Sequence, residues 1–337
     1  MIIPWRNSIA GTLLCLALLS LSSAQDTKKR QATNGPVQVQ MRNVMYHYTD
    51  KVAVHIRLLG GELLSTHDGQ FPVFDDKNSF TLKIAAGEMA MSPDSLANVL
   101  NSYVFARHDA PLKDLSITIE GDHLKVKGKL HNKGDIGFEE QGRLSATPDG
   151  KIRLHADKIR ALHLPVKGMM DLFGLDIANL IKTGKVRGVE VDKDDMIFDP
   201  QQILPPPHIQ GQITSIRLEK GNIVQVFGNP QKHRWEPNPA QNYMAYHGNK
   251  LQFGKLIMVD TDMIIIDMEP SDAFDFFLDH YRDQLAAGYT KTTREFGLRV
   301  FMKDYNKLST SRAKRENPAK KKSLQAGEDD PAKFPRQ

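Results

Sequence analysis

The sequence predicts an α+β protein that is rich in antiparallel strands and has few, strongly apolar helices. Two observations predict this class. Apolar and polar residues alternate along several segments, which is typical of half-buried antiparallel strands. Residues 164–184 instead have the spacing of an apolar helix, and strand-like segments flank them.

The strand prediction depends on four segments with a period of two. Apolar residues recur at every second position in residues 52–56, 115–119, 124–126 and 152–156. The last of these follows Asp149-Gly150, a dipeptide that commonly turns a hairpin. A continuous apolar run at 263–266 predicts a further strand that is covered on both faces.

Three shorter helices are predicted from their start signals. Ser92 is a capping residue followed by Pro93, and Pro200 follows Asp199 in the same way. A third helix is predicted from Ser271 to Ala287, because apolar side chains between these residues share one face and Gly288 ends the pattern. The segments that lead into these helices, residues 87–91, 194–198 and 262–268, all have the pattern of strands.

The helix predicted for residues 164–184 has Pro165 in its first turn and Gly184 at its end. Leu172 and Leu175 lie off its main apolar face, so the helix needs a second apolar neighbour. That neighbour is either another sheet or an acyl chain. The main apolar face consists of Val166, Met169, Met170, Phe173, Ile177, Leu180 and Ile181.

The first residues predict export from the cytoplasm. Arg6 precedes an apolar run at 9–21 and small residues at 22–24, which predicts a signal peptide over residues 1–24 and a periplasmic or envelope location. An uncleaved membrane anchor is the alternative. The single cysteine, Cys15, lies inside this segment, so the mature chain would have neither a disulfide nor a cysteine nucleophile.

The remaining chain divides by composition. Residues 25–36 are predicted to be a linker and residues 37–228 a first domain, which ends in a hairpin. Residues 229–302 are either a second strand-rich and helical module or a continuation of the first domain. Residues 303–337 have a net charge of +5, equal to that of the whole chain, and no apolar period, so they are predicted to be a disordered basic tail. The tail is either merely solvated or a tether to anionic lipid headgroups, and nucleic acid is not an expected partner.

No known catalytic motif is present in the sequence. The carboxylates of Asp192, Asp194, Asp195 and Asp199 lack the glycine and closing glutamate of a calcium loop, and they are predicted to surround a hairpin turn. There is no nucleophile elbow, HExxH, phosphate loop or dinucleotide fingerprint. The protein is therefore predicted to have no enzymatic activity, no cofactor and no metal.

Several short motifs together resemble the LmeA family of phospholipid-binding proteins. The resemblance covers residues 79–228, and the motifs that carry it are LHLPVKG at 162–168, LFGL at 172–175, GVEV at 188–191, DP at 199–200, LPPPHIQG at 204–211 and FG at 227–228. Members of this family are exported bacterial envelope proteins that bind phospholipid. The resemblance implies a tubular lipid-binding (TULIP-like) fold, in which a long curved antiparallel sheet wraps around one or two apolar helices.

We therefore expect an exported protein that binds, or binds and transfers, a phospholipid or another acyl lipid in an apolar groove. Phe173 and Phe276 are candidates for contact with a bilayer, although packing is their alternative fate. The other functions considered are a scaffolding envelope protein with a filled core, and a hydrolase that uses residues 192–199 with His155 or His208. The residues expected to line the groove are Leu164, Val166, Met169, Met170, Phe173, Ile177, Leu180, Ile181, Ile209, Ile213 and Ile216.

Overall fold

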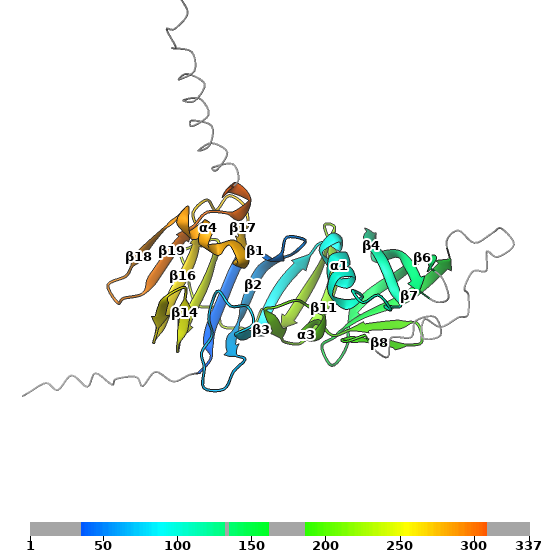
Figure 1. Cartoon of the computed structure of the whole chain (residues 1–337), viewed down its shortest axis with the longest axis horizontal. Coiled ribbons are helices and arrows are strands. Elements are labelled where there is room, and N and C mark those ends of the chain that lie inside the picture. The colour runs from blue at the N-terminus through cyan, green and yellow to red at the C-terminus, as the bar shows by residue number, and fades with distance from the viewer. Residues whose placement is uncertain (1–34, 132–134, 162–185, 309–337) are drawn as a thin grey trace, which may run out of the picture. The chain divides into compact units, whose positions relative to one another are not determined.

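The computed structural model describes residues 35–131, 135–161 and 186–308, all of which belong to one compact unit of the chain. The prediction of a strand-rich protein is confirmed. The strands do not form a single antiparallel sheet, however. They form an eleven-stranded mixed sheet, a six-stranded sheet and a two-stranded ribbon (Figure 1).

The eleven-stranded sheet is built around three long neighbouring strands, β1, β2 and β3. Most of its pairs are antiparallel, but β17 pairs with β1, β10 with β3 and β19 with β16 in parallel. In sheet order its main strands are β11 (Ile213–Glu219), β12 (Asn222–Gly228), β3 (Phe80–Met91), β2 (Val52–Ser65), β1 (Val37–Thr49), β13 (Tyr243–Gly248), β16 (Thr261–Asp267), β19 (Leu298–Met302) and β18 (Tyr289–Thr292). The two side strands are β10 (His208–Gln210) and β17 (Phe274–Phe277).

The six-stranded sheet is antiparallel throughout. Leu115 and Ile117 are buried and their neighbours face outward, as the alternation predicts. Gly150 adopts a φ of +83° in the turn before β7, a conformation that favours glycine. The strands follow the order β4 (Leu112–Glu120), β5 (His123–His131), β6 (Asp135–Ala146), β7 (Ile152–Ala161), β9 (Asp195–Phe198) and β8 (Val189–Asp192).

Helix α1 (Pro93–Val99) begins where the sequence predicts, with the Ser92 side chain accepting a hydrogen bond from the Ser95 amide. It continues as a π-helical segment, η1 (Leu100–Val104). Ser95 Oγ accepts a bond from the Ala53 amide of β2, and the Asn101 side chain bonds both backbone groups of Leu115 in β4. The helical segment is thus hydrogen-bonded to one strand of each large sheet. The second predicted start is also found, as α3 (Pro200–Ile203) with Asp199 as its cap.

The predicted helix from Ser271 to Ala287 is largely wrong. Its first part is strand β17, followed by a 3₁₀ turn, η3 (Leu278–His280), and a short helix, α4 (Tyr281–Ala286). The reason is tertiary, because Phe274 and Phe276 pair with Val44 and Tyr46 of β1 and are fully buried. A buried strand next to β1 outweighs the local helical spacing. Phe276 is therefore a core residue of the described fold and not a surface side chain.

Residues 229–302 continue the large sheet. Strand β13 pairs with β1, and β16 and β19 follow it, while β14 (Leu251–Phe253) and β15 (Leu256–Met258) form the separate ribbon. The fold also extends past the predicted tail boundary at residue 303. Asp304, which is 1% exposed, accepts a hydrogen bond from the Asp275 amide, and Lys307 forms an ion pair with it in the turn η4 (Tyr305–Lys307).

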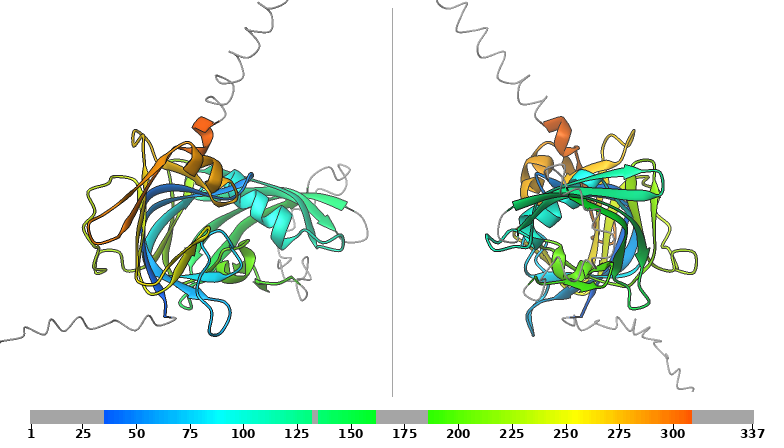
Figure 2. Two further views of the ribbon diagram at one scale, coloured as in Figure 1. Left: turned by 60° about the vertical axis from the view of Figure 1, so that its left-hand side comes forward. Right: turned by 90° about the vertical axis from the view of Figure 1, so that its right-hand side faces the viewer.

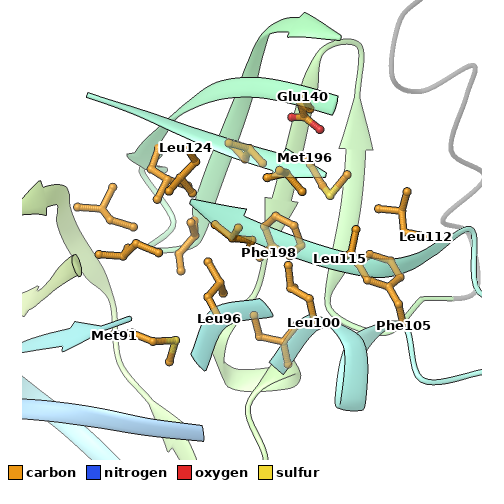
Figure 3. A pocket seen from close by; sticks show the side chains of 18 of the residues that line it. Met91, Leu96, Leu100, Phe105, Leu112, Leu115, Leu124, Glu140, Met196 and Phe198 are labelled. Atoms are coloured by element: carbon orange, nitrogen blue, oxygen red, sulfur yellow. The ribbon is translucent and has the colours of Figure 1, made fainter. Parts of the chain in front are cut away.

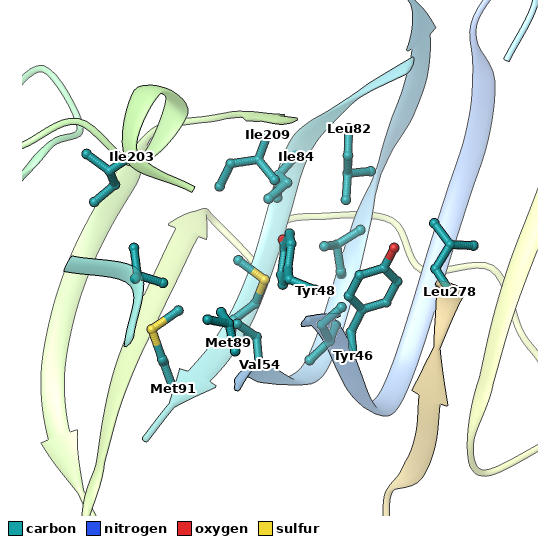
Figure 4. Packing of buried hydrophobic residues seen from close by; sticks show 14 of the residues in the cluster. Tyr46, Tyr48, Val54, Leu82, Ile84, Met89, Met91, Ile203, Ile209 and Leu278 are labelled. Carbon is teal, nitrogen blue, oxygen red and sulfur yellow. The ribbon is translucent and has the colours of Figure 1, made fainter. Parts of the chain in front are cut away.

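One continuous apolar core connects both large sheets, and the strands curve as they pass along it (Figure 2). Figure 4 shows part of this core, from Leu278 past Tyr48 and Met89 to Met91 and Ile203. Tyr243, Ala245 and Ile264 form a small second cluster. No helix in the described ranges is long and apolar enough to cross a membrane.

Several predictions fall outside the described residues. They are the signal peptide, the linker up to residue 34, the helix at 164–184 and the tail from residue 309. Eight predicted groove residues lie there as well: Leu164, Val166, Met169, Met170, Phe173, Ile177, Leu180 and Ile181.

Candidate functional site

The three groove residues that the structure describes lie in or next to the core. Ile209 and Ile213 are buried, with exposed fractions of 2% and 1%. Only Ile216 lines the apolar cavity described below. The structure therefore places Ile216 at the apolar cavity, Ile209 in the packed interior, and Ile213 in the interior and at the wall of a separate open pocket.

A small apolar cavity lies between α1, the inner face of the six-stranded sheet and the neighbouring end of the large sheet. Its volume is about 50 Å³. Leu96 and Leu100 of the helical segment face it from one side, and Figure 3 shows them opposite Phe198. The lining residues are Met91, Leu96, Leu100, Phe105, Leu112, Leu115, Ile117, Leu124, Val126, Phe138, Glu140, Leu144, Ile152, Leu154, Met196, Phe198, Ile203, Ile216, Ile223 and Gln225.

The local sequence explains why this cavity is apolar. Leu115 and Ile117 on β4, and Leu124 and Val126 on β5, occupy the alternating inward positions of their strands. Helix α1 adds Leu96 and the π-helical segment η1 adds Leu100, and both side chains line the cavity. The period-two pattern therefore identified these strands, but it did not show that their inward faces leave a space.

Glu140 is the charged residue of this mostly apolar lining, and sequence reasoning missed it. The residue is 4% exposed, and its Oε1 atom has no hydrogen-bond partner among the described residues. Burial raises the pKa of the Glu140 carboxyl from 4.5 to about 7. A signal was available, since Glu140 shares the inward face of β6 with Phe138 and Leu144.

An open cleft of about 790 Å³ adjoins the cavity, and Ile203 lines both. The cleft has mixed walls, in which Arg107, Asp109, Arg187 and His208 lie among apolar residues such as Leu204. Arg107 makes two hydrogen bonds to the Asp109 carboxylate, whereas His208 Nδ1 is buried without a partner in the described structure. The apolar cavity therefore lies next to a more polar cleft that has two guanidinium groups and one carboxylate.

A second apolar cavity, of about 30 Å³, lies further along the core. Tyr46, Tyr48 and Tyr246 line it together with Phe276 and Pro207. Burial raises the pKa of all three tyrosine hydroxyls, so they remain neutral. Pro207 lines this cavity and the preceding residue, Pro206, lines the cleft.

The carboxylates at 192–199 form a hairpin, as predicted. Asp192 and Asp195 pair across the β8–β9 turn, where Lys193 has a φ of 51°. Asp195 contacts His155 at 2.7 Å, and Asp199 caps α3. Within the described ranges, no group of three or more His, Cys, Asp or Glu side chains is arranged to hold a metal ion.

No family model, curated protein or solved structure matches this chain. The resemblance to the LmeA family therefore remains a hypothesis that is based on the short motifs alone. The geometry of the cavities is the basis for the functional proposal that follows.

Proposed function

We propose that this protein binds an acyl lipid, such as a phospholipid, in the apolar cavity between α1 and the six-stranded sheet, and that it does so without catalysis. The main support for this proposal is the lining of that cavity. Among the described residues that line it, Glu140 and Gln225 have the only polar side chains. Burial of an acyl chain is favourable by about 0.8 kcal/mol per methylene. Such a lining suits a hydrocarbon chain better than a polar substrate.

The size of the cavity sets a condition on binding. A water molecule needs about 10–15 Å³, and a cavity of about 150 Å³ in another protein holds benzene. At about 50 Å³, the cavity accepts a long chain only if the lining side chains move apart. Met91 and Met196 are suited to such movement, because methionine side chains have several rotatable bonds and adapt to irregular spaces.

The adjoining cleft suggests how the bound lipid is oriented. Arg187 and Arg107 line the cleft, although Asp109 offsets the charge of Arg107, and guanidinium groups bind phosphate oxygens well. In the proposed complex the headgroup lies in the cleft and the chain extends past Ile203 into the cavity. The curved sheets are proposed to form the remaining walls of a TULIP-like tube.

The membrane and location are part of the same proposal. We infer that the chain is exported and works in the bacterial envelope, and that the basic tail holds it near anionic lipid. Each basic residue near such a surface contributes about 1 kcal/mol. Sedimentation with anionic and zwitterionic vesicles, compared between the full mature chain and a variant that ends at Leu308, measures the part played by the tail.

Mass spectrometry tests lipid binding. Residues 25–337, purified without detergent, are extracted with organic solvent and compared with an unrelated exported protein. Phospholipid in a one-to-one ratio supports the proposal. A protein that is empty and also takes up no lipid from vesicles contradicts it and favours a scaffolding role.

A matched pair of variants locates the site. Leu96→Trp fills the cavity and is expected to reduce retained lipid at least severalfold. Leu256→Trp adds the same side chain at a position that is 48% exposed, and lipid retention should not change. Equal retention in both variants, with both folded, would place the lipid elsewhere.

A further inference from the structure

Among the described residues that line the cavity, Glu140 is the one with a charged group. It lies on β6 between Val126 of β5 and Ile159 of β7, and its side chain faces inward. Figure 3 shows the carboxyl group directed into the cavity near Met196. The position is part of the regular inward alternation of the strand and not of a loop or an edge.

One oxygen of this carboxyl has no partner in the described part of the protein. Oε1 has no hydrogen-bond partner in the described structure, and no lining residue besides Glu140 is titratable. Gln225 of β12 is the only other polar side chain among the described lining residues. An isolated buried carboxyl destabilises a fold, and a leucine or glutamine would satisfy the same strand position without that cost.

We propose that the Glu140 carboxyl binds a hydrogen-bond donor, a hydroxyl or an amine, on the amphiphile that enters this cavity. This inference rests on the proposed lipid-binding function and deepens it, because it names a chemical feature that the ligand must carry. The chain occupies the apolar lining, and the donor group reaches Oε1. Amphiphiles that place a carboxylate or an ether at this point are disfavoured.

Physical chemistry supports this selectivity. A buried acceptor that stays unpaired loses the free energy of its hydration, and a ligand that supplies a donor restores it. Burial raises the pKa of Glu140 to about 7, so the ionised carboxylate, which only accepts hydrogen bonds, predominates above that pH and there favours donors over acceptors. The comparison of ligands is therefore made near pH 8.5. A ligand without a donor leaves the Glu140 oxygen without a hydrogen bond, and the free energy of its lost hydration is not recovered.

The test compares ligands that differ in a single group. 1-Dodecanol, dodecylamine and 1-methoxydodecane share a chain, but only the first two carry a donor. Their affinities for the mature chain, 25–337, are measured by displacement of a fluorescent apolar probe. Wild type is expected to bind the alcohol and the amine at least about tenfold more tightly than the ether.

Variants at position 140 assign this preference to the carboxyl. Glu140→Leu should bring the alcohol-to-ether ratio close to one. Glu140→Gln keeps an acceptor without the charge, so it should retain the preference for the alcohol and lose most of the preference for the amine. Glu139→Gln is the matched control, because Glu139 is the preceding residue and pairs with Lys127 on the other face of the strand.

The outcomes separate the two proposals. If wild type binds all three compounds with equal affinity, lipid binding stands and the role of Glu140 is refuted. The same conclusion follows if Glu140→Leu keeps the wild-type ratio. If wild type binds none of them, both proposals fail. Folding of the variants is checked by circular dichroism, and both changes at Glu140 remove a buried charge, so they are expected to fold.

Discussion

For some residues of this protein, the neighbouring sequence does not reveal whether the side chain is buried. Glu140 has two carboxyl oxygens and a hydrophilic identity, yet it is buried at an inward strand position. Phe276 was a candidate for bilayer contact, and it is fully enclosed. In both cases the neighbours that decide the environment come from other strands.

The buried carboxyl makes stability depend on pH in a defined direction. The folded state keeps the Glu140 proton up to about pH 7, whereas the unfolded chain releases it near 4.5. Its contribution to stability is therefore complete below pH 4.5 and is lost as the pH rises through about 7. Glu140→Gln should match wild type in acid and be more stable by on the order of 3 kcal/mol near pH 8.

Urea unfolding at a series of pH values measures this difference. Because both proteins share all other titratable groups, the difference between them isolates Glu140. Glu139→Gln serves as the control and should keep the wild-type pH profile. A constant difference between Glu140→Gln and wild type across the range would show that the folded-state pKa of Glu140 is not raised.

A substitution at Phe276 tests whether this side chain packs in the core or contacts a membrane. Since the side chain is fully buried, Phe276→Ala should lower the free energy of unfolding by about 3–5 kcal/mol. Phe296→Ala removes a ring that is 93% exposed and should change stability by less than about 0.5 kcal/mol. Chemical denaturation measures both, and similar small effects would argue against the burial of Phe276.

At the scale of helices and strands, local sequence signals determine some elements and tertiary contacts determine others. The Ser92-Pro93 start produced α1 as predicted, because a capping side chain and a first-turn proline act within a few residues. The apolar spacing at 274–285 failed to give one helix. There the strand β1 offers Phe274 and Phe276 a buried pairing partner that the local sequence does not reveal.

The cap of α1 can be tested directly. The Ser92 hydroxyl accepts a hydrogen bond from the Ser95 amide. Removal of this hydroxyl leaves the amide without its acceptor. Ser92→Ala should cost about 1 kcal/mol in stability, while Ser92→Asp restores an acceptor and should cost little. Equilibrium unfolding in urea gives both values, and an unchanged midpoint for the alanine variant would contradict the role of the cap.

At the scale of the whole molecule, residues distant in sequence build one sheet and one core. Strand β1 is hydrogen-bonded to β2, to β13 and to β17. The segment from 229 to 302 therefore does not stand apart from the first domain, since its strands extend the sheet that β1 to β3 begin. The cavity likewise draws on both large sheets.

This arrangement predicts that the first domain does not fold alone. A chain of residues 35–228 would expose the edge of β1 and the buried side chains that contact β13 and β17. We expect it to aggregate or to remain unfolded, with little dispersion in its proton NMR spectrum. The full mature chain should unfold in one calorimetric transition. Two separable transitions, or a well-folded 35–228 fragment, would show that 229–302 is an independent module.

The sequence by itself determined the features that depend on neighbouring residues. The period-two strands at 52–56 and 115–119, the starts at Ser92 and Asp199, and the turn at Gly150 all follow from steric and hydrogen-bonding preferences over a few positions. The tertiary structure alone decided the mixed sheet, the strand at Phe274, the enclosure of Glu140 and the cavity around it. Those depend on which strands pair across long separations, and alternation along a single strand does not specify its partners.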